Sequence, residues 1–423
     1  MTASSSPIPE PSGGIRLRRR DQILTTAAEL FATKGYTRTS MRDVATASGI
    51  LAGSLYHHFE SKESIAVELV EKYHADLADA VRKFGPVDTD PLTALRLFTR
   101  EVAEVSFRHQ AALQIRMFDA PTTASSSLKT VIHADPASLN RRWRTLISAA
   151  VADGAIGPNV DPRLLRHVLY HVTTQAGLVA WAWQANAGTR DVADCITAII
   201  FDGLASAPPR YDDKSAAIAV VNETAQQWAA DARERLAGRR GAVLAAARDQ
   251  FALRGFESTT VRDIAEAAGL TASNLYRHFE SKDSMIVEIL GGFSDRLLAA
   301  YKEVLGAGTT VTDTLDALMW LLHQASRQYA PEIEILQGYR RLAALGVTEH
   351  YEQGAQARLG MLSHLIAAGV AAGELNDVAD SQLAATCVRE IMWSPMRDLV
   401  AVSPLRARDF YRHTVLSGAA AHR

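Results

Sequence analysis

Two short stretches of the chain, 52–59 and 272–279, carry hydrogen-bonding and aromatic side chains on one side and apolar side chains on the other. In the first stretch, Leu55 and Phe59 stand four residues apart with His58 beside them, the spacing at which side chains share one face of a helix. We expect this face to pack inward. The opposite face offers groups that suit the phosphates and base edges of a nucleic acid. Its residues are Gly53, Ser54, Tyr56 and His57 in the first stretch and Ser273, Asn274, Tyr276 and Arg277 in the second.

Polar and basic residues that flank the two stretches extend this candidate surface. The tyrosine hydroxyls suit phosphates, which position a protein on DNA without selecting a sequence, and plain surface packing is the alternative. Lys62 and Lys282 begin the next helix, where a lysine opposes the helix dipole but suits a nearby phosphate; a solvated lysine is the alternative. The remaining candidates are the helix-opening residues Thr39, Ser40, Thr259, Thr260 and Thr271 and the helix-surface residues Arg42 and Arg262. The cluster Arg16, Arg18, Arg19 and Arg20 either reaches DNA or forms an arm without fixed contacts.

The elements that must position these residues occur twice. Residues 31–70 return at 251–290 without a gap, and half of the forty paired positions are identical. In the first copy, an amphipathic helix ends at Gly35, and a capping box from Ser40 to Asp43 opens a short helix that ends near Gly49. A tight turn then leads into 52–59, and a longer helix starts at Lys62. Two short helices around a glycine-containing turn, packed on a preceding helix, predict a helix-turn-helix.

Composition limits the other possibilities. The 423 residues carry a net charge of −2, so any basic surface must be local. The chain has two cysteines and no CxxC or HExxH pattern, and we expect a reducing cytoplasm, no metal and no cofactor. No apolar run approaches the roughly 20 residues needed to span a membrane. An enzyme is the main rival class, but no glycine-rich phosphate loop, nucleophile elbow or paired carboxylates support it.

The motif residues resemble the N-terminal signature of the TetR family of bacterial transcriptional regulators. The resemblance rests on Thr-Ser-Met-Arg-Asp-Val-Ala at 39–45, Leu-Tyr-His-His-Phe at 55–59 and Ser61-Lys62, and on Leu-Tyr-Arg-His-Phe at 275–279 with Ser281-Lys282. It implies an all-α fold of two tandem TetR-like units, as in the fused double form. Each unit would hold a three-helix DNA-binding domain and a helical domain for ligand binding and dimerisation.

These observations predict six segments. They are a disordered tail (1–15), a first DNA-binding domain called head 1 (16–75), a first regulatory domain (76–206), a linker (207–236), a second DNA-binding domain called head 2 (237–292) and a second regulatory domain (293–423). Head 1 with its regulatory domain is half 1, and head 2 with its own is half 2. The halves are expected to pair through their last helices, as a pseudo-dimer within one chain.

The resemblance implies a DNA-binding regulator. We expect a repressor that binds double-stranded DNA and is released from it by a small apolar effector. Aromatic and methionine side chains of the regulatory domains are candidates for an effector pocket, with ordinary core packing as the alternative. Head 1 departs from the family pattern: Leu51 stands where head 2 has Thr271, and Ala52 and Gly53 follow. The operator is therefore expected to be asymmetric. The alternative is that head 2 alone selects the sequence.

Overall fold

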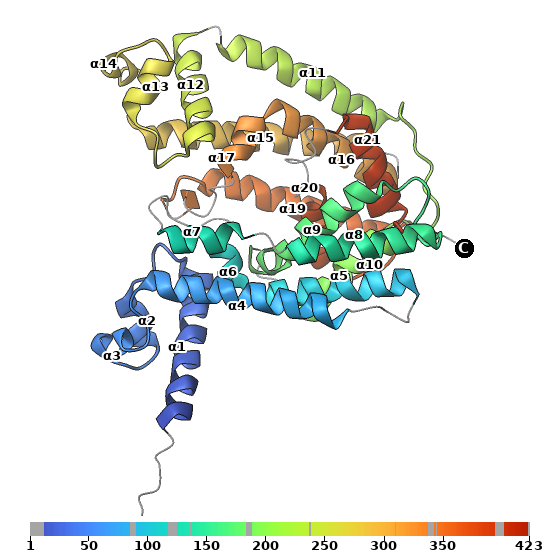
Figure 1. Cartoon of the computed structure of the whole chain (residues 1–423). Helices are drawn as coiled ribbons and strands as arrows, with labels where there is room; N and C mark the ends of the chain where they lie inside the picture. Colours follow the sequence, from blue (N-terminus) through green and yellow to red (C-terminus); the bar gives the residue numbers. More distant parts are fainter. Residues whose placement is uncertain are drawn as a thin grey trace, which may run out of the picture. The chain divides into compact units, whose positions relative to one another are not determined.

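The computed structural model describes residues 12–84, 90–116, 125–134, 137–182, 188–236, 238–308, 310–336, 342–343, 345–393 and 402–421. Within these ranges the protein is helical, with two isolated β-bridges and no strand, which confirms the all-α prediction (Figure 1). Its contacts define two compact units. Unit 1 comprises Met1–Ala75 and His109–Asp135, and unit 2 comprises Asp76–Arg108 and Pro136–Arg423.

The helices of the two halves follow one plan. Half 1 contains α1 (Ser12–Lys34), α2 (Met41–Ala47), α3 (Ala52–Tyr56), α4 (Lys62–Lys83), α5 (Pro91–Arg108), α6 (Gln110–Gln114), α7 (Ser126–His133), α8 (Ala137–Ala152), α9 (Pro162–Ala182) and α10 (Thr189–Asp202). The rest of the chain contains α11 (Ala216–Leu236), α12 (Arg239–Arg254), α13 (Val261–Ala267), α14 (Ala272–Leu275), α15 (Lys282–Ala307), α16 (Val311–Gln328), α17 (Ala330–Ile335), α19 (Glu349–Ala371), α20 (Ser381–Trp393), α21 (Pro404–Tyr411) and the π-helical turn η4 (Arg412–Leu416). Because α5 and α16 begin 220 positions apart, as do α6 and α17, the repeat continues beyond the heads.

Unit 1 is built around α1, whose residues Ile23, Ala27 and Phe31 are fully buried. The short helix α6 packs on α1, where the Gln114 side-chain amide donates a hydrogen bond of 3.2 Å to the carbonyl oxygen of Ala32. The predicted disordered tail needs a correction, because α1 already begins at Ser12. The arginines and the leucine that follow favour helix and continue it toward the N-terminus. The remainder of that tail, 1–11, lies outside the described residues.

Unit 2 contains α11, which lies in the segment predicted as a linker. This helix packs along α15 and α16 and therefore forms part of the body of half 2 (Figure 1). Its Trp228 is buried and meets the ring of Tyr329 edge to face at 5.2 Å, and its Asn222 accepts a hydrogen bond of 3.0 Å from the indole of Trp320. The segment 207–236 is therefore part of the packed body of half 2 as well as a linker, because the apolar face of α11 is buried against α15 and α16.

The two halves meet within unit 2. Helices α9 and α10 of half 1 contact α20 of half 2, and α10 also contacts η4. Cys195 of α10 and Cys387 of α20 are both fully buried there as free thiols. A hydrogen bond from Cys195 and burial raise the pKa of the Cys387 thiol, so Cys387 favours the neutral, unreactive form.

Main-chain hydrogen bonds join the ends of the two halves reciprocally. Leu204 and Ala205 donate to the carbonyl oxygens of Val415 and Leu416, both at 2.9 Å, and Ala419 and Ala420 donate to those of Ile200 and Phe201 at 2.8 and 3.0 Å. At the centre of this exchange, Gly203 and Gly418 approach each other in left-handed conformations, with φ of 78° and 82°. A methyl group on Gly203 would lie 2.4 Å from the Gly418 nitrogen, so the crossing requires glycine.

A buried ionic cluster ties α16 to the last helices of half 2. The Asp316 carboxylate accepts hydrogen bonds from Arg408 at 3.2 and 2.5 Å and from Arg412 at 2.9 and 2.8 Å. All three residues are less than a tenth exposed. Arg412 also donates to Asp213, in the segment that joins the halves, at 2.6 Å. This cluster therefore anchors the joining segment as well as the C-terminal helices.

Candidate DNA-binding sites

Hydrogen bonds between residues close in sequence start the helix-turn-helix of head 1. The Ser40 hydroxyl accepts a hydrogen bond of 3.1 Å from the Asp43 backbone N–H, and the Asp43 carboxylate accepts one of 2.7 Å from the Ser40 backbone N–H. This capping box starts α2 as predicted. The Lys34 ammonium, 2.8 Å from Asp43, and the bonds from Ser40 keep the pKa of this carboxyl well below its ordinary value. Gly49 then turns the chain toward α3 with φ of 66°.

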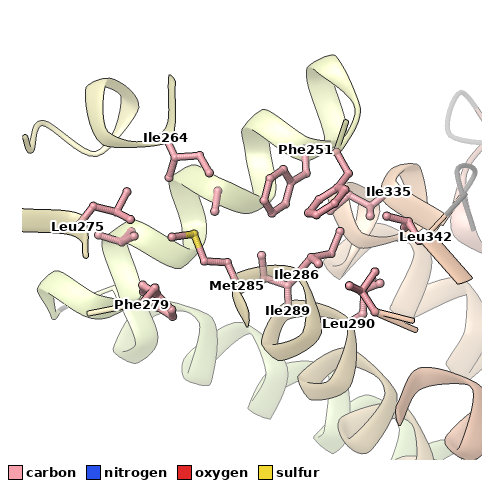
Figure 2. Packing of buried hydrophobic residues seen from close by; sticks show 14 of the residues in the cluster. Phe251, Ile264, Leu275, Phe279, Met285, Ile286, Ile289, Leu290, Ile335 and Leu342 are labelled. Atoms are coloured by element: carbon pink, nitrogen blue, oxygen red, sulfur yellow. The ribbon is translucent and has the colours of Figure 1, made fainter. Parts of the chain in front are cut away.

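Head 2 repeats the arrangement with Thr260, Asp263 and Gly269 at the matching positions. Its core is a single apolar cluster in which Ile264, Leu275 and Phe279 of the helix-turn-helix face Phe251 and Met285 (Figure 2). Ile335 and Leu342 extend the same cluster beyond the head. The second helix of the helix-turn-helix, called the recognition helix, therefore packs on this cluster through the buried side chain of Leu275.

The exposed side of each recognition helix carries the predicted residues. Leu55 and Phe59 are buried, whereas Tyr56 and Tyr276 are 53% and 55% exposed at matching positions. The other exposed members of the two faces are Gly53, Ser54 and His57 in head 1 and Thr271, Ser273, Asn274 and Arg277 in head 2. Arg42 and Arg262 are exposed on α2 and α13. Each head thus exposes polar and aromatic side chains at these positions.

Lys62 and Lys282 have a role that the sequence did not reveal. The Lys282 ammonium donates hydrogen bonds of 2.7 and 2.9 Å to the carbonyl oxygens of Phe256 and Thr259 and lies 4.3 Å from the centre of the Phe256 ring. Lys62 binds the Tyr36 carbonyl oxygen and ring in the same way, at 2.8 and 4.3 Å. Partial burial lowers the pKa of Lys282. Both lysines therefore fasten the start of the long helix to the turn that precedes the helix-turn-helix.

The prediction that Thr39 and Thr259 cap helices and contact DNA needs a correction, because the structure does not place their hydroxyls toward solvent. Each residue is only 1% exposed. Their hydroxyls donate hydrogen bonds of 2.8 Å to the carbonyl oxygens of Gly35 and Gly255, where α1 and α12 end. The N-terminal caps of α2 and α13 are instead Ser40 and Thr260, both exposed. The buried threonines therefore stabilise the turn that precedes each helix-turn-helix.

The basic cluster at the start of head 1 lies in α1, and two of its arginines have partners. Arg19 donates a hydrogen bond of 2.9 Å to the carbonyl oxygen of Ser48. Arg20 pairs with Glu68 and lies 4.4 Å from the centre of the Phe59 ring. In head 2, Arg240 makes the same two contacts, with the Glu288 carboxylate and the Phe279 ring. The recurrence of these three residue types at the constant offset of 220 positions is the sequence signal from which this contact could have been predicted.

Replacing Lys282 with methionine is expected to speed amide hydrogen exchange in α13 and α14. The variant loses bonds to two carbonyl groups, which should lower the local opening free energy by about 1–2 kcal/mol for a partly exposed charged donor. Arg262→Met, an exposed change on α13, is the matched control and should shift it by less than about 0.5 kcal/mol. Unchanged protection in Lys282→Met, together with a shallower salt dependence of DNA binding, would assign the lysine to phosphate instead.

Other kinds of site find no support in the described part of the chain. No group of three or more histidine, cysteine or carboxylate side chains is arranged to hold a metal ion among the residues described. Over the same residues, no helix is both long and apolar enough to cross a bilayer.

Comparison with known proteins identifies the family. The model of the tetR family of bacterial regulatory proteins matches residues 23–69 and 243–289, the two heads. The HTH-type transcriptional repressor KstR2 of Rhodococcus jostii is 36% identical over 167 residues, which are 38% of this chain and 79% of that protein. KstR2 of Mycolicibacterium smegmatis is 31% identical over 194 residues, 45% of this chain and 95% of that protein. The structure of the ketosteroid transcriptional regulator KstR2 of Mycobacterium tuberculosis is 30% identical, covers 42% of this chain and 90% of that one, and has a TM-score of 0.39. The chain therefore belongs to the TetR family of bacterial transcriptional regulators, which are not enzymes, and it carries the family's DNA-binding region twice.

Proposed function

We propose that this protein is a cytoplasmic transcriptional repressor that holds one operator with two non-identical heads and releases it when a small apolar effector binds. One observation carries the proposal: both recognition helices, α3 (Ala52–Tyr56) and α14 (Ala272–Leu275), are exposed on one side, but they and the turns that follow them present different side chains. The relatives from Rhodococcus jostii and Mycolicibacterium smegmatis are transcriptional repressors by name, which supports repression. A gel-shift assay of the full chain on fragments that flank its own gene tests DNA binding and supplies the operator.

The two half-sites of the operator are expected to differ in sequence. Arg277 and Asn274 in head 2 suit bidentate contacts to guanine and adenine, each worth about 1–3 kcal/mol of discrimination. Head 1 offers Ser54 and His57 in their place. Selection of sites from random DNA should therefore return an asymmetric site whose halves lie about one helical turn apart. Base changes under head 2 should weaken binding more than changes under head 1.

Matched variants sharpen this prediction. Arg277→Ala should weaken operator binding by about 10-fold or more and relax one base position, whereas His57→Ala should have a smaller effect. Arg262→Ala, a charge change outside the recognition helix, should affect all sequences alike. Recovery of a perfect palindrome that tolerates changes equally on both sides would refute the asymmetry.

A second candidate function is a protein in which head 2 alone selects the sequence. Head 1 favours this alternative because the recognition helix opens with Leu51, Ala52 and Gly53, which have no hydrogen-bonding side chains. In that case every base change under head 1 would leave the affinity unchanged, while phosphate contacts through Tyr56 would still contribute to binding.

We propose that the effector binds in the helical regulatory domains and is a lipid, a sterol or an acyl thioester. The apolar side chains expected to surround it include Phe98, Met319 and Met392, which are buried. The expected pocket residues Met117, Phe118, Trp183 and Tyr339, and the side chains of Trp181 and Trp393, lie outside the described residues. Titration of the protein–operator complex with ligands of these three classes tests release.

His323 of α16 suits a polar contact to such an effector. It is 5% exposed, and among the described residues neither ring nitrogen has a hydrogen-bond partner. Burial and the nearby Arg327 lower the pKa of His323 to about 4, so its imidazole is neutral at pH 7. A neutral imidazole has one donor and one acceptor, which a carbonyl or hydroxyl group of the effector would satisfy.

We propose that one chain is a sufficient DNA-binding unit. The reciprocal main-chain bonds between residues 200–205 and 415–420 support this, because they use the dimerisation helices within a single chain. Pairing inside one chain also proceeds at a high effective concentration. Sedimentation of the protein–operator complex should therefore give one chain per duplex.

A further inference from the structure

Leu51 is the most exposed large apolar side chain of the described residues. It is 79% exposed and occupies the N-cap position of α3, with an extended backbone and no side-chain capping bond. A leucine is a poor N-cap, because it cannot accept a hydrogen bond from the first turn of the helix. Helix stability therefore does not explain a leucine at this position.

The matching residue of head 2 shows what this position ordinarily does for the helix. Thr271 caps α14, since its hydroxyl accepts a hydrogen bond of 3.3 Å from the Asn274 backbone N–H. Its side chain is engaged by its own helix. Leu51 makes no capping hydrogen bond, and its exposed side chain lies at the start of the recognition helix.

The surroundings of Leu51 restrict what it can contact. In a docked helix-turn-helix, the N-terminal residues of the recognition helix face the base edges in the major groove. Ala52 and Gly53 are exposed and have no polar side-chain atoms, and a methyl group on Gly53 would meet no atom within 4 Å. This end of α3 therefore presents an apolar surface to the groove. In the major groove, the apolar group that distinguishes one base from the others is the C5-methyl of thymine.

We propose that Leu51 contacts the C5-methyl group of a thymine in the half-site under head 1 and thereby selects that base. The inference rests on the proposed DNA-binding function and deepens it. Head 1 selects sequence through apolar contact, whereas head 2 does so through the hydrogen bonds of Asn274 and Arg277. The two heads differ in the chemistry of base recognition as well as in their residues.

Replacing single thymines by deoxyuridine removes the methyl group and keeps base pairing unchanged, so it tests this contact directly. The full chain is titrated against the selected operator and against duplexes with one uracil each in the half-site under head 1. At one position the wild type should bind about 3- to 10-fold more weakly, the range expected for losing one methyl-sized apolar contact. Leu51→Ala should bind the thymine and uracil duplexes equally.

Two controls separate this contact from general effects. Leu253→Ala, on α12, removes a leucine of nearly equal exposure, 77%, and should keep the wild-type uracil profile. The salt dependence of binding should be the same for wild type and Leu51→Ala, because leucine neutralises no phosphate. An unchanged salt dependence would also show that Leu51→Ala still docks on the operator.

Three outcomes would overturn the proposal. In the first, the wild type binds every uracil duplex as tightly as the thymine duplex. In the second, Leu51→Ala keeps the full uracil penalty with unchanged affinity for the thymine duplex. In the third, it keeps that penalty but binds all duplexes more weakly by one factor, which would assign the leucine to sugar carbons. In each case binding to the unmodified operator persists, so the proposed function stands. Absence of binding to any selected operator would refute both.

Discussion

Asp316→Asn is expected to lower the free energy of unfolding by about 3–5 kcal/mol, the range for removing one partner of a buried ion pair. The carboxylate is 2% exposed and compensates two arginines, Arg408 and Arg412, which are 4% and 7% exposed. Asparagine has a similar shape but no charge, so two guanidinium groups would remain buried with only the exposed carboxylates of Asp213 and Asp409 nearby. Calorimetry or urea unfolding of the full chain measures the loss.

Asp213→Asn is the matched control for this prediction. It removes a carboxylate that also binds Arg412 but whose side chain is 69% exposed. Its loss should cost less than about 1 kcal/mol, as for most exposed ion pairs. Equal effects of the two variants would show that burial does not set the energetic weight of this cluster.

The heads could be predicted from sequence because their information is local. A capping box needs only Ser40 and Asp43, three residues apart, and the inward stripe needs only the spacing of Leu55 and Phe59. The copy in head 2 then tested each assignment, since a residue that faces outward in one head should do so in the other. Tyr56 and Tyr276 meet this requirement with nearly equal exposure.

Contacts between distant segments could not be predicted in the same way. Lys282 was predicted to contact DNA because a lysine at the start of a helix opposes the helix dipole but suits a phosphate. Its partners are instead the carbonyl oxygens of residues 256 and 259, in the turn before the helix-turn-helix. Thr259 resembles its neighbour Thr260 in sequence but is buried at the end of α12. Such outcomes depend on how a turn folds back on a helix, which residue type and spacing do not specify.

The junction between the halves was even less accessible to sequence analysis. Helices near 190–205 and 405–419 were expected to pair, but nothing in the sequence distinguished Gly203 and Gly418 from other helix-ending glycines such as Gly154. The difference is spatial. A methyl group on Gly154 would meet no atom within 4 Å, whereas one on Gly203 would collide with main-chain atoms of the other half.

Gly203→Ala and Gly418→Ala are therefore expected to be among the most disruptive single methyl additions in the chain. At Gly203 the new carbon would lie 2.4 Å from the Gly418 nitrogen and the Leu416 oxygen, and at Gly418 it would lie 2.5 Å from the Asp202 carbonyl carbon. Backbone atoms cannot rotate away as side chains do, so the halves must separate locally. The bonds from Leu204 to Val415 and from Ala419 to Ile200, 2.9 and 2.8 Å long, would then be strained or lost.

Gly154→Ala and Gly373→Ala provide matched controls, because both glycines have φ near 70° and open space around the missing side chain. These variants should cost about 1–2 kcal/mol, the penalty of a left-handed conformation alone. The two junction variants should cost at least about 2 kcal/mol more, since they add a main-chain collision to the same penalty.

The chain contains its own reporter of this separation. Its two cysteines, Cys195 and Cys387, are fully buried between α10 and α20, where the halves meet. A thiol reagent should react with them only when the junction opens, so an additional cost of 2 kcal/mol at the junction should speed labelling by about 30-fold. The two control variants should label at nearly the wild-type rate. If all four variants label alike, the crossing of Gly203 and Gly418 does not hold the halves together, and the side-chain contacts of α9, α10 and α20 must do so alone.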